Sequence, residues 1–278
     1  MIGQIELKNK IMSQISNNTF PRFSILVGQS GSGKKMMCKF ISTHLNAYTY
    51  YCETGVDAIR KMITESYKVS SKILYIIADA DKMSLAAKNA LLKVTEDPPQ
   101  NAYFVITITD TNNILSTIKS RGTTFYMNTY TVDELVEYGK TVTNYTLSDE
   151  DIYILKNICE TPGEVNKLFS TSDTMLAQNF YNYVEKVVDN IALVSGANSF
   201  KIGDRIAFKD TDTDKFDLQL FWKAFMTVCI DRLTTDPFKY SLGIKTTSKY
   251  LQELRVVGIN KQATFDMWIL DIRQEWMK

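Results

Sequence analysis

The first half of the chain alternates short apolar runs with amphipathic stretches of helical period. Five runs are strand candidates, at residues 23–27, 48–51, 73–78, 103–108 and 123–126. Helical stretches begin between them, near Lys34, Val56, Ser84 and Asn112. Because continuous apolar runs are typical of strands covered on both faces, the alternation predicts a parallel sheet flanked by helices. The expected fold class is an α/β layered domain.

The second half of the chain has helical period. Thr131 and Ser148 precede acidic first turns, as helix caps do, and predict two helices. From about residue 174 to the end, apolar residues recur on three helical faces. The faces are Leu176, Phe180, Val184, Val187 and Ile191; Leu218, Phe221, Trp222, Phe225 and Cys229; and Phe265, Trp268, Ile269, Ile272 and Trp276. They predict the core of a helical bundle, and an oligomer interface is the alternative for the faces left over.

Composition and charge narrow the classes of protein that fit. A chain of 278 residues is long enough for two or three compact units. The net charge of +1 gives no overall basic field, so nucleic acid would be bound through a local patch or within a larger assembly. The four cysteines include no Cys-x-x-Cys pair, which argues against a zinc site or disulfides and favours a cytoplasmic location. No apolar run has the length of a membrane span, and the N-terminus lacks a signal-peptide layout.

A glycine-rich segment carries the most specific chemical motif. Residues 28–35 have the sequence Gly-Gln-Ser-Gly-Ser-Gly-Lys-Lys between a predicted strand and a predicted helix, the context that a phosphate loop requires. The glycines let backbone amides turn toward phosphate oxygens, and the helix N-terminus adds favourable partial charge. A plain glycine-rich turn is the alternative. The candidate residues for binding nucleotide or phosphate are Gly28, Gly31, Ser32, Gly33, Lys34 and Lys35.

The residue after Lys34 bears on whether this motif holds a metal ion. Lys34 is at the position that reaches the terminal phosphates, and the next position normally carries Ser or Thr, whose hydroxyl ligates Mg²⁺. That position is Lys35 here. A second lysine at a helix N-terminus is unfavourable until an anion arrives. We therefore expect ATP, ADP or phosphate to bind without a metal ion, with no cofactor required; a solvated surface lysine is the alternative for Lys35.

Further segments extend this motif into a family pattern. They are Ile2-Gly3-Gln4, Pro21-Arg22-Phe23, Val56-Asp57-Ala58-Ile59-Arg60, Asp81-Lys82-Met83, the helix with a double proline at residues 89–99, and Thr117-Ile118-Lys119-Ser120-Arg121-Gly122. In this order and spacing they resemble the AAA+ clamp-loader subunits of replicative DNA polymerases, and most of all the bacterial delta-prime subunit of DNA polymerase III. The resemblance covers about residues 1–170. Many relatives carry a four-cysteine zinc module after the phosphate loop, which this chain lacks.

The resemblance implies where magnesium ligands should lie. Motor subunits of the family place an Asp-Glu pair after an apolar strand, and Ala78 and Asp79 stand at those positions here. Ala78 has no carboxylate, and the side chain of Asp79 is one methylene shorter than that of glutamate. Asp79 and Asp81 have a second interpretation, as carboxylates that cap the helix ahead of Ser84. In the segment 161–164, Glu164 replaces the usual arginine of the family's sensing helix.

The resemblance also gives Arg121 a role in a neighbouring subunit. In clamp loaders, the arginine of the Ser-Arg segment projects into the ATP site of the next subunit, where it stabilises charge on the transferred phosphoryl group. Arg121 is therefore the candidate catalytic residue, acting in trans. The alternative is a structural arginine that caps its own helix or pairs with a carboxylate. Gly122 departs from the family pattern, which has cysteine there.

The family pattern implies an AAA+ phosphate-loop domain at residues 1–128 and a helical lid at 129–172. Chain order and helical period predict an all-helical collar at 173–278. Residues 170–174 form a polar, cap-rich stretch that marks the expected boundary between lid and collar, and residues 198–214 are expected to be a polar connection. The expected function is that of a delta-prime-like stator with a degenerate ATPase site, in a complex that loads the sliding clamp onto primed DNA.

The expected partners follow from the same resemblance. They are gamma/tau-like and delta-like clamp-loader subunits, primer-template DNA within the complex and, indirectly, the sliding clamp; no membrane is expected. The first alternative is an active, gamma-like AAA+ ATPase in which Asp79 and Asp81 hold the metal ion. The second is a phosphate-loop interaction protein outside replication.

Overall fold

The chain forms two compact units. The computed structural model describes residues 2–169, 175–194, 196–209, 212, 215–254, 256 and 258–277. The first unit consists of Met1–Glu134 with Thr161–Gly163, and the second of Leu135–Glu160 with Glu164–Lys278. The separation of residues 129–172 from 173–278 stays a prediction, and its boundary at 170–174 lies outside the described residues.

The first unit is built on a five-stranded parallel sheet, as predicted. Its strands are β1 (Phe23–Val27), β2 (Tyr48–Cys52), β3 (Ile73–Ile77), β4 (Ala102–Ile108) and β5 (Thr123–Tyr126), in the order β2-β3-β4-β1-β5. All four pairings are parallel. The edge strand β2 has four exposed residues out of five, whereas every residue of β1 and β4 is buried. The α/β class expected from the sequence is confirmed.

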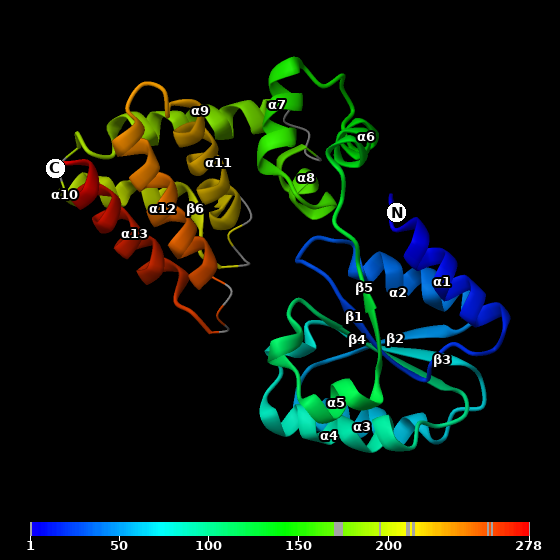
Figure 1. The fold of residues 1–278 in the computed structure, drawn as a ribbon. Helices are drawn as coiled ribbons and strands as arrows, with labels where there is room; N and C mark the ends of the chain where they lie inside the picture. The colour runs from blue at the N-terminus through cyan, green and yellow to red at the C-terminus, as the bar shows by residue number, and fades with distance from the viewer. Residues whose placement is uncertain are drawn as a thin grey trace. The chain divides into compact units, whose positions relative to one another are not determined.

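Helices cover both faces of this sheet, as Figure 1 shows. One layer contains α1 (Ile5–Ser16) and α2 (Lys34–Leu45), and the other contains α3 (Val56–Ser66), α4 (Leu85–Glu96) and α5 (Ser116–Arg121). Because side chains alternate across a strand, Ile25 packs into the core with α3, α4 and α5, and Leu26 packs into the core with α1 and α2. Two short 3₁₀ turns, η1 (Ala80–Lys82) and η2 (Thr111–Asn113), follow β3 and β4.

The predicted helix near Asn112 is wrong in its position. That segment forms only the turn η2, and the α-helix begins at Ser116. The carboxylate of Asp110 accepts the amide N–H of Asn112 at 2.8 Å and holds a local turn. Ile114 and Leu115 then adopt extended backbone angles, which no helix can pass through.

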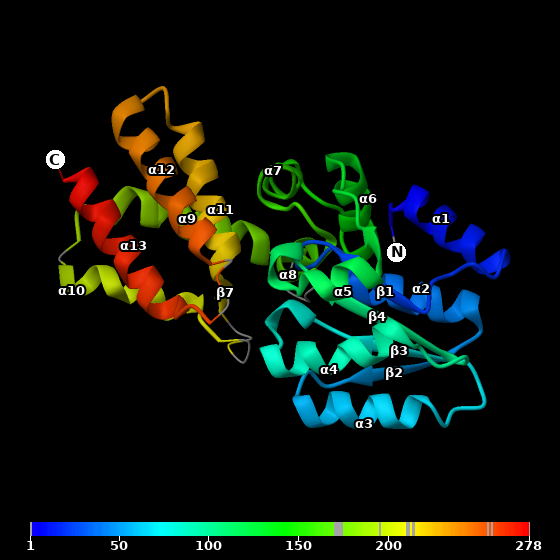
Figure 2. The ribbon, with the colours of Figure 1, turned by 60° about the horizontal axis from the view of Figure 1, so that its bottom comes forward.

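The described residues of the second unit form helices and one pair of two-residue strands. Its helices are α6 (Val132–Val142) and α8 (Pro162–Phe169), which both begin in the first unit, and α7 (Asp149–Ile158), α9 (Leu176–Asn190), α10 (Gly196–Ser199), α11 (Leu218–Asp231), α12 (Pro237–Glu253) and α13 (Lys261–Trp276). The 3₁₀ turn η3 (Phe200–Arg205) precedes β6 (Ile206–Ala207), which pairs with β7 (Phe216–Asp217). Figures 1 and 2 both show α11, α12 and α13 side by side.

The predicted aromatic faces form the core of this unit. Trp222, Phe225, Phe265 and Trp268 are fully buried, and the rings of Phe225 and Trp268 meet edge to face with centroids 4.9 Å apart. The predicted caps are confirmed as well, because the Ser148 hydroxyl accepts the Asp151 amide at 3.1 Å. Among the described residues, no helix is both long and apolar enough to cross a membrane.

The predicted polar connection at 198–214 is only partly correct. Its described part contains the end of α10, the turn η3 and strand β6, where Ile206 is fully buried. Residues 210, 211, 213 and 214 lie outside the described residues. The alternating aspartates at the end of this segment indicate a polar connection. A strand of only two residues leaves almost no pattern in a sequence.

Candidate nucleotide site and interface arginine

The phosphate-loop motif lies at the carboxyl end of the parallel sheet, between β1 and α2. Gly31 has a φ of +79° and Gly33 a φ of +90°, a backbone region that favours glycine. A side chain at Gly31 would meet the Thr161 hydroxyl at 2.6 Å. The glycines are thus required by the path of the backbone, which supports the interpretation of residues 28–33 as a phosphate loop.

Lys34 is folded back onto this loop. Its amine donates to the carbonyl oxygens of Gly28 at 2.6 Å and Gln29 at 2.9 Å. Burial lowers the pKa of Lys34, and the nearby carboxylates of Asp79 and Asp81 oppose that effect. Because the charged amine is partly desolvated, an anion in the loop would stabilise it more than the two carbonyl groups do.

The loop also contains an unsatisfied polar atom. The Ser32 hydroxyl is buried and has no hydrogen-bond partner among the described residues. The Tyr130 hydroxyl donates to the Ser32 carbonyl at 2.7 Å and holds the backbone of the loop. A buried hydroxyl without a partner is costly, and a phosphate oxygen is an acceptor that would satisfy it. The residues present therefore fit a phosphate group.

The same residues do not fit a magnesium ion bound in the family's manner. Lys35 is exposed, and Ala78 supplies no oxygen from its side chain. The Asp79 carboxylate pairs with Lys82 at 3.2 Å. One oxygen of the buried Asp81 carboxylate accepts the amide and the hydroxyl of Thr109, the former at 2.9 Å. The Asp79 carboxylate and one oxygen of Asp81 are thus engaged within the loops that follow β3 and β4. The other Asp81 oxygen is buried and has no hydrogen-bond partner among the described residues.

Neither aspartate caps α4, contrary to the second interpretation of Asp79 and Asp81. The Ser84 hydroxyl performs that task and accepts the Ala87 amide at 3.2 Å. Asp79 instead has a φ of +51°, and its amide donates to the Thr107 hydroxyl at 3.1 Å. A serine next to the first helical residue is a better cap than a carboxylate several residues earlier, because its hydroxyl reaches the third amide of the helix.

The segment Thr161–Gly163 packs directly on the phosphate loop. The Gly163 amide donates to the Gly31 carbonyl at 3.0 Å. A methyl group on Gly163 would lie 2.5 Å from the Gly31 Cα and 3.1 Å from its carbonyl oxygen, so it would push two backbones apart. The Thr-Pro-Gly sequence that resembles the family's turn into the sensing helix is thereby explained by a close backbone contact.

Gly163→Ala is expected to destabilise the first unit by about 1–3 kcal/mol, because backbone atoms cannot swing aside as a flexible side chain can. Urea unfolding followed by circular dichroism measures the change. Gly55→Ala is the matched control, since a Cβ at Gly55 would meet nothing within 4 Å. Equal stability of the two variants would contradict the close contact.

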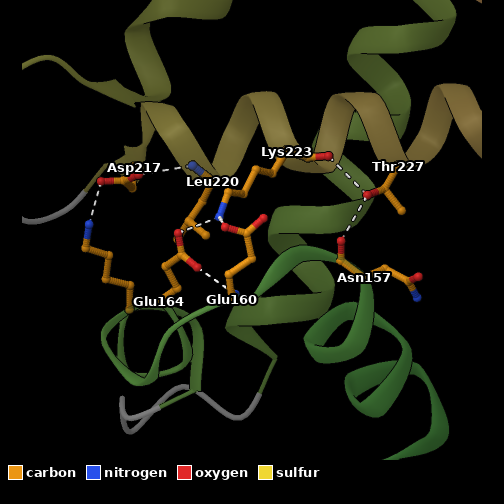
Figure 3. A network of polar contacts seen from close by, with 8 residues as sticks. Asn157, Glu160, Glu164, Asp217, Leu220, Lys223 and Thr227 are labelled. Atoms are coloured by element: carbon orange, nitrogen blue, oxygen red, sulfur yellow. Dashed lines mark hydrogen bonds and ion pairs between the residues drawn. The ribbon is translucent and has the colours of Figure 1, made fainter. Parts of the chain in front are cut away.

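Glu164, the residue in place of the usual arginine, is held within the second unit. Its carboxylate accepts the Glu160 amide at 2.7 Å and the Lys223 amine at 2.8 Å (Figure 3). Lys223 also pairs with the Glu160 carboxylate at 3.0 Å. Lys223 and Glu164 are both buried, so this cluster of one amine and two carboxylates joins the start of α8 to α11. The charge of Glu164 is therefore compensated inside its own unit.

Arg121 stands at the end of α5 with its side chain 37% exposed. Its guanidinium donates to the Thr117 carbonyl at 3.0 Å and pairs with the Glu96 carboxylate at 3.0 Å. Glu96 is the last residue of α4, so the contact joins two segments that carry the family resemblance. These contacts match the structural alternative for Arg121. Because the ion pair between Arg121 and Glu96 is exposed, breaking it would cost little free energy. Exposed ion pairs contribute about 0–1 kcal/mol.

The departure at Gly122 has a packing explanation. A Cβ at this position would lie 2.9 Å from Phe23 and 3.0 Å from Ile25. The side chains of Phe23 and Ile25 thus occupy the space that a Cβ at position 122 would need.

Comparisons with known proteins agree with this arrangement. The family model for the delta subunit of DNA polymerase III matches residues 53–131, from the end of β2 to the start of α6. The chain is 23% identical over 244 residues to the DNA polymerase III subunit gamma of Buchnera aphidicola, covering 76% of this chain and 68% of that protein. It is 29% identical over 110 residues to subunit delta' of Escherichia coli, covering 36% of this chain and 33% of that protein. These likenesses support a clamp-loader subunit of the AAA+ class.

A solved structure extends the likeness in fold over nearly the whole chain. It is that of a DNA polymerase III gamma subunit-related protein from Thermotoga maritima, with a TM-score of 0.55, 16% identity, and coverage of 97% of this chain and 99% of that chain. At this identity the likeness establishes the fold. The chain is similar in sequence to both gamma and delta' subunits, so these likenesses do not distinguish the two types. The type of subunit has to be argued from the chemistry of the site.

Proposed function

We propose that this chain is a delta-prime-like stator of a clamp loader, with a degenerate ATPase site of its own. The observation that carries the proposal is the loss of both family magnesium ligands, at Lys35 and Ala78, in a loop that still fits phosphate. If only one of these two positions had changed, the other would still supply a ligand to the ion. Two losses on the same ion favour a site released from hydrolysis.

In this role the phosphate loop binds an anion and has no chemical step to perform. The backbone amides of Gly31 and Gly33, the Ser32 hydroxyl and the Lys34 amine would hold phosphate or the phosphates of ATP or ADP. Lys35, exposed at the start of α2, would add a second positive charge in place of the metal ion.

Arg121 is the residue through which the chain would act on a neighbouring subunit. Its guanidinium would leave Glu96 and stabilise the charge that develops on the phosphoryl group in the neighbour's ATP site. Gamma/tau-like and delta-like subunits are the proposed partners. Through them the chain would support loading of the sliding clamp onto primer-template DNA.

The isolated chain is expected to show no ATP turnover above background at saturating Mg²⁺, because neither direct ligand position supplies an oxygen. A coupled assay with and without DNA measures this, and Lys34→Ala serves as the control for contaminating ATPase. Steady turnover that disappears in Lys34→Ala would overturn the stator proposal.

A gamma-like motor subunit is the second candidate, favoured by the longer alignment with a gamma subunit. It requires Asp79 and Asp81 to bind the metal ion. Asp79→Asn should then abolish turnover. The stator proposal expects the same substitution to change only the ion pair with Lys82.

A further inference from the structure

A groove of about 800 Å³ lies in the second unit, between α9 and the segment formed by α10 and η3. Lys186 lines it from α9, and Lys201 and Arg205 line it from η3. All three cations are exposed. No acidic residue lines the groove within the described part of the chain. It therefore presents a locally positive surface on a chain whose net charge is only +1.

The three cations of the groove are also unpaired. No ion pair of Lys186, Lys201 or Arg205 occurs among the described residues. The acidic residues of α9, Glu185 and Asp189, instead pair with Arg232, the residue that follows α11. The carboxylates of α9 are thus neutralised by Arg232, and Lys186 is left without an acidic partner on its own helix.

The rest of the lining is aliphatic and amide. Val187 and Ile191 are buried and Ile202 is half-buried, so they give the groove an apolar floor. Asn182 and Asn198 line it from its two sides and are exposed. Asparagine amides both donate and accept, and they can pair with the N–H and C=O groups of an extended backbone.

The aromatic residue in this lining is not available to stack on a nucleobase. The Tyr183 ring packs against Phe216 at a centroid distance of 5.7 Å, and the Arg205 guanidinium lies 5.3 Å from its centroid. Its hydroxyl donates to the Ile202 carbonyl at 2.9 Å. Single-stranded nucleic acid relies on free aromatic faces, so the lining favours a different polyanion.

We propose that this groove binds a short acidic peptide segment of a partner protein. Aliphatic side chains of the peptide would lie on the half-buried Val194 and Ile202, and its carboxylates would pair with Lys186, Lys201 and Arg205. The groove face of α9 from Asn179 to Asn190 is about 16 Å long at 1.5 Å per residue. That length accommodates about five residues of extended peptide. The Arg205 guanidinium, held against Tyr183, suits a bidentate contact with a carboxylate.

Fluorescence anisotropy with the full-length protein tests the proposal. The probe is a labelled peptide that alternates glutamate with leucine, and the comparison probes are the same peptide with glutamine for glutamate and an oligothymidylate of equal length. The acidic peptide is expected to bind at least about tenfold more tightly than either, since three ion pairs of up to about 1 kcal/mol each exceed the 1.4 kcal/mol of a tenfold change. Tighter binding of the oligothymidylate would overturn the peptide in favour of nucleic acid.

Charge reversal locates the binding. The double variant K186E/R205E is expected to weaken the acidic peptide about tenfold or more, because two attractions become repulsions. Lys245→Glu, on the exposed surface of α12, is the matched control and should leave binding unchanged. Circular dichroism verifies that each variant is folded. An equal loss in both variants, or no binding of the acidic peptide to the natural protein up to about millimolar concentration, would overturn the proposal.

Discussion

Arg121→Ala is expected to lower ATP turnover by about 10³ at one site of a clamp loader assembled with active gamma-type subunits. The reason is that the guanidinium would supply positive charge where the phosphoryl group of the neighbour's ATP becomes more negative. Total turnover should fall only by the share of that site, whereas clamp loading should fall further if the sites act in sequence. Steady-state ATPase and clamp-loading assays on the reconstituted complex measure the two effects.

Two controls separate this role from a structural one. Lys119→Ala removes a positive charge from the same helix two residues earlier and should leave turnover unchanged. Glu96→Gln removes the negative charge that pairs with Arg121 at 3.0 Å and should not reduce activity, because the arginine remains. If Arg121→Ala destabilises the monomer while the assembled complex keeps full turnover, the arginine is structural.

Lys223→Met is expected to destabilise the second unit by about 3–5 kcal/mol, because it leaves the buried Glu164 carboxylate without its cation. The side chains of Lys223 and Glu164 are 9% and 11% exposed. Urea unfolding at neutral pH measures the loss. Lys167→Met is the matched control, since the ion pair of Lys167 with Asp217 is more exposed and should contribute less than about 1 kcal/mol. Adding Glu164→Gln to Lys223→Met should recover much of the lost stability.

The pH dependence of this effect has a definite sign. Burial alone would lower the pKa of Lys223, but Glu164 and Glu160 outweigh burial and raise it above its ordinary value of 10.5. A raised lysine pKa stabilises the folded state fully below the unfolded value, and the contribution is lost as pH rises through the folded value. The stability difference between the natural protein and Lys223→Met should therefore stay constant from neutral pH upward and shrink only above about pH 10.5. A difference that disappears near neutral pH would contradict the buried pair.

The sequence predicted the sheet and the phosphate loop because both depend on neighbouring residues. The strands at 23–27 and 123–126 match β1 and β5 in full, since buried strands are continuous apolar runs. Ser148 was identified as a cap because its partner, Asp151, is three residues away. Local rules of this kind need no knowledge of the fold.

Contacts between distant residues could not be predicted in this way. Lys223 and Glu164 are 59 positions apart, and no pattern in either segment indicates the other. The pairing of Arg121 with Glu96 depends on the packing of α4 against α5, which neither segment encodes alone. A glycine in the first turn of a helix, such as Gly163, was an available sign of a close backbone contact, because glycine is unfavourable inside helices.

The four cysteines have a practical consequence for labelling. All are buried, and burial raises the thiol pKa of Cys38, Cys159 and Cys229 to about 12 and that of Cys52 to about 11. The reactive thiolate is therefore scarce at neutral pH, so maleimide reagents should leave the natural thiols unmodified. A new cysteine on an exposed helical position would carry a fluorophore selectively, without prior removal of the natural ones. Single-molecule measurements on the assembled complex could then use a chain with its natural core intact.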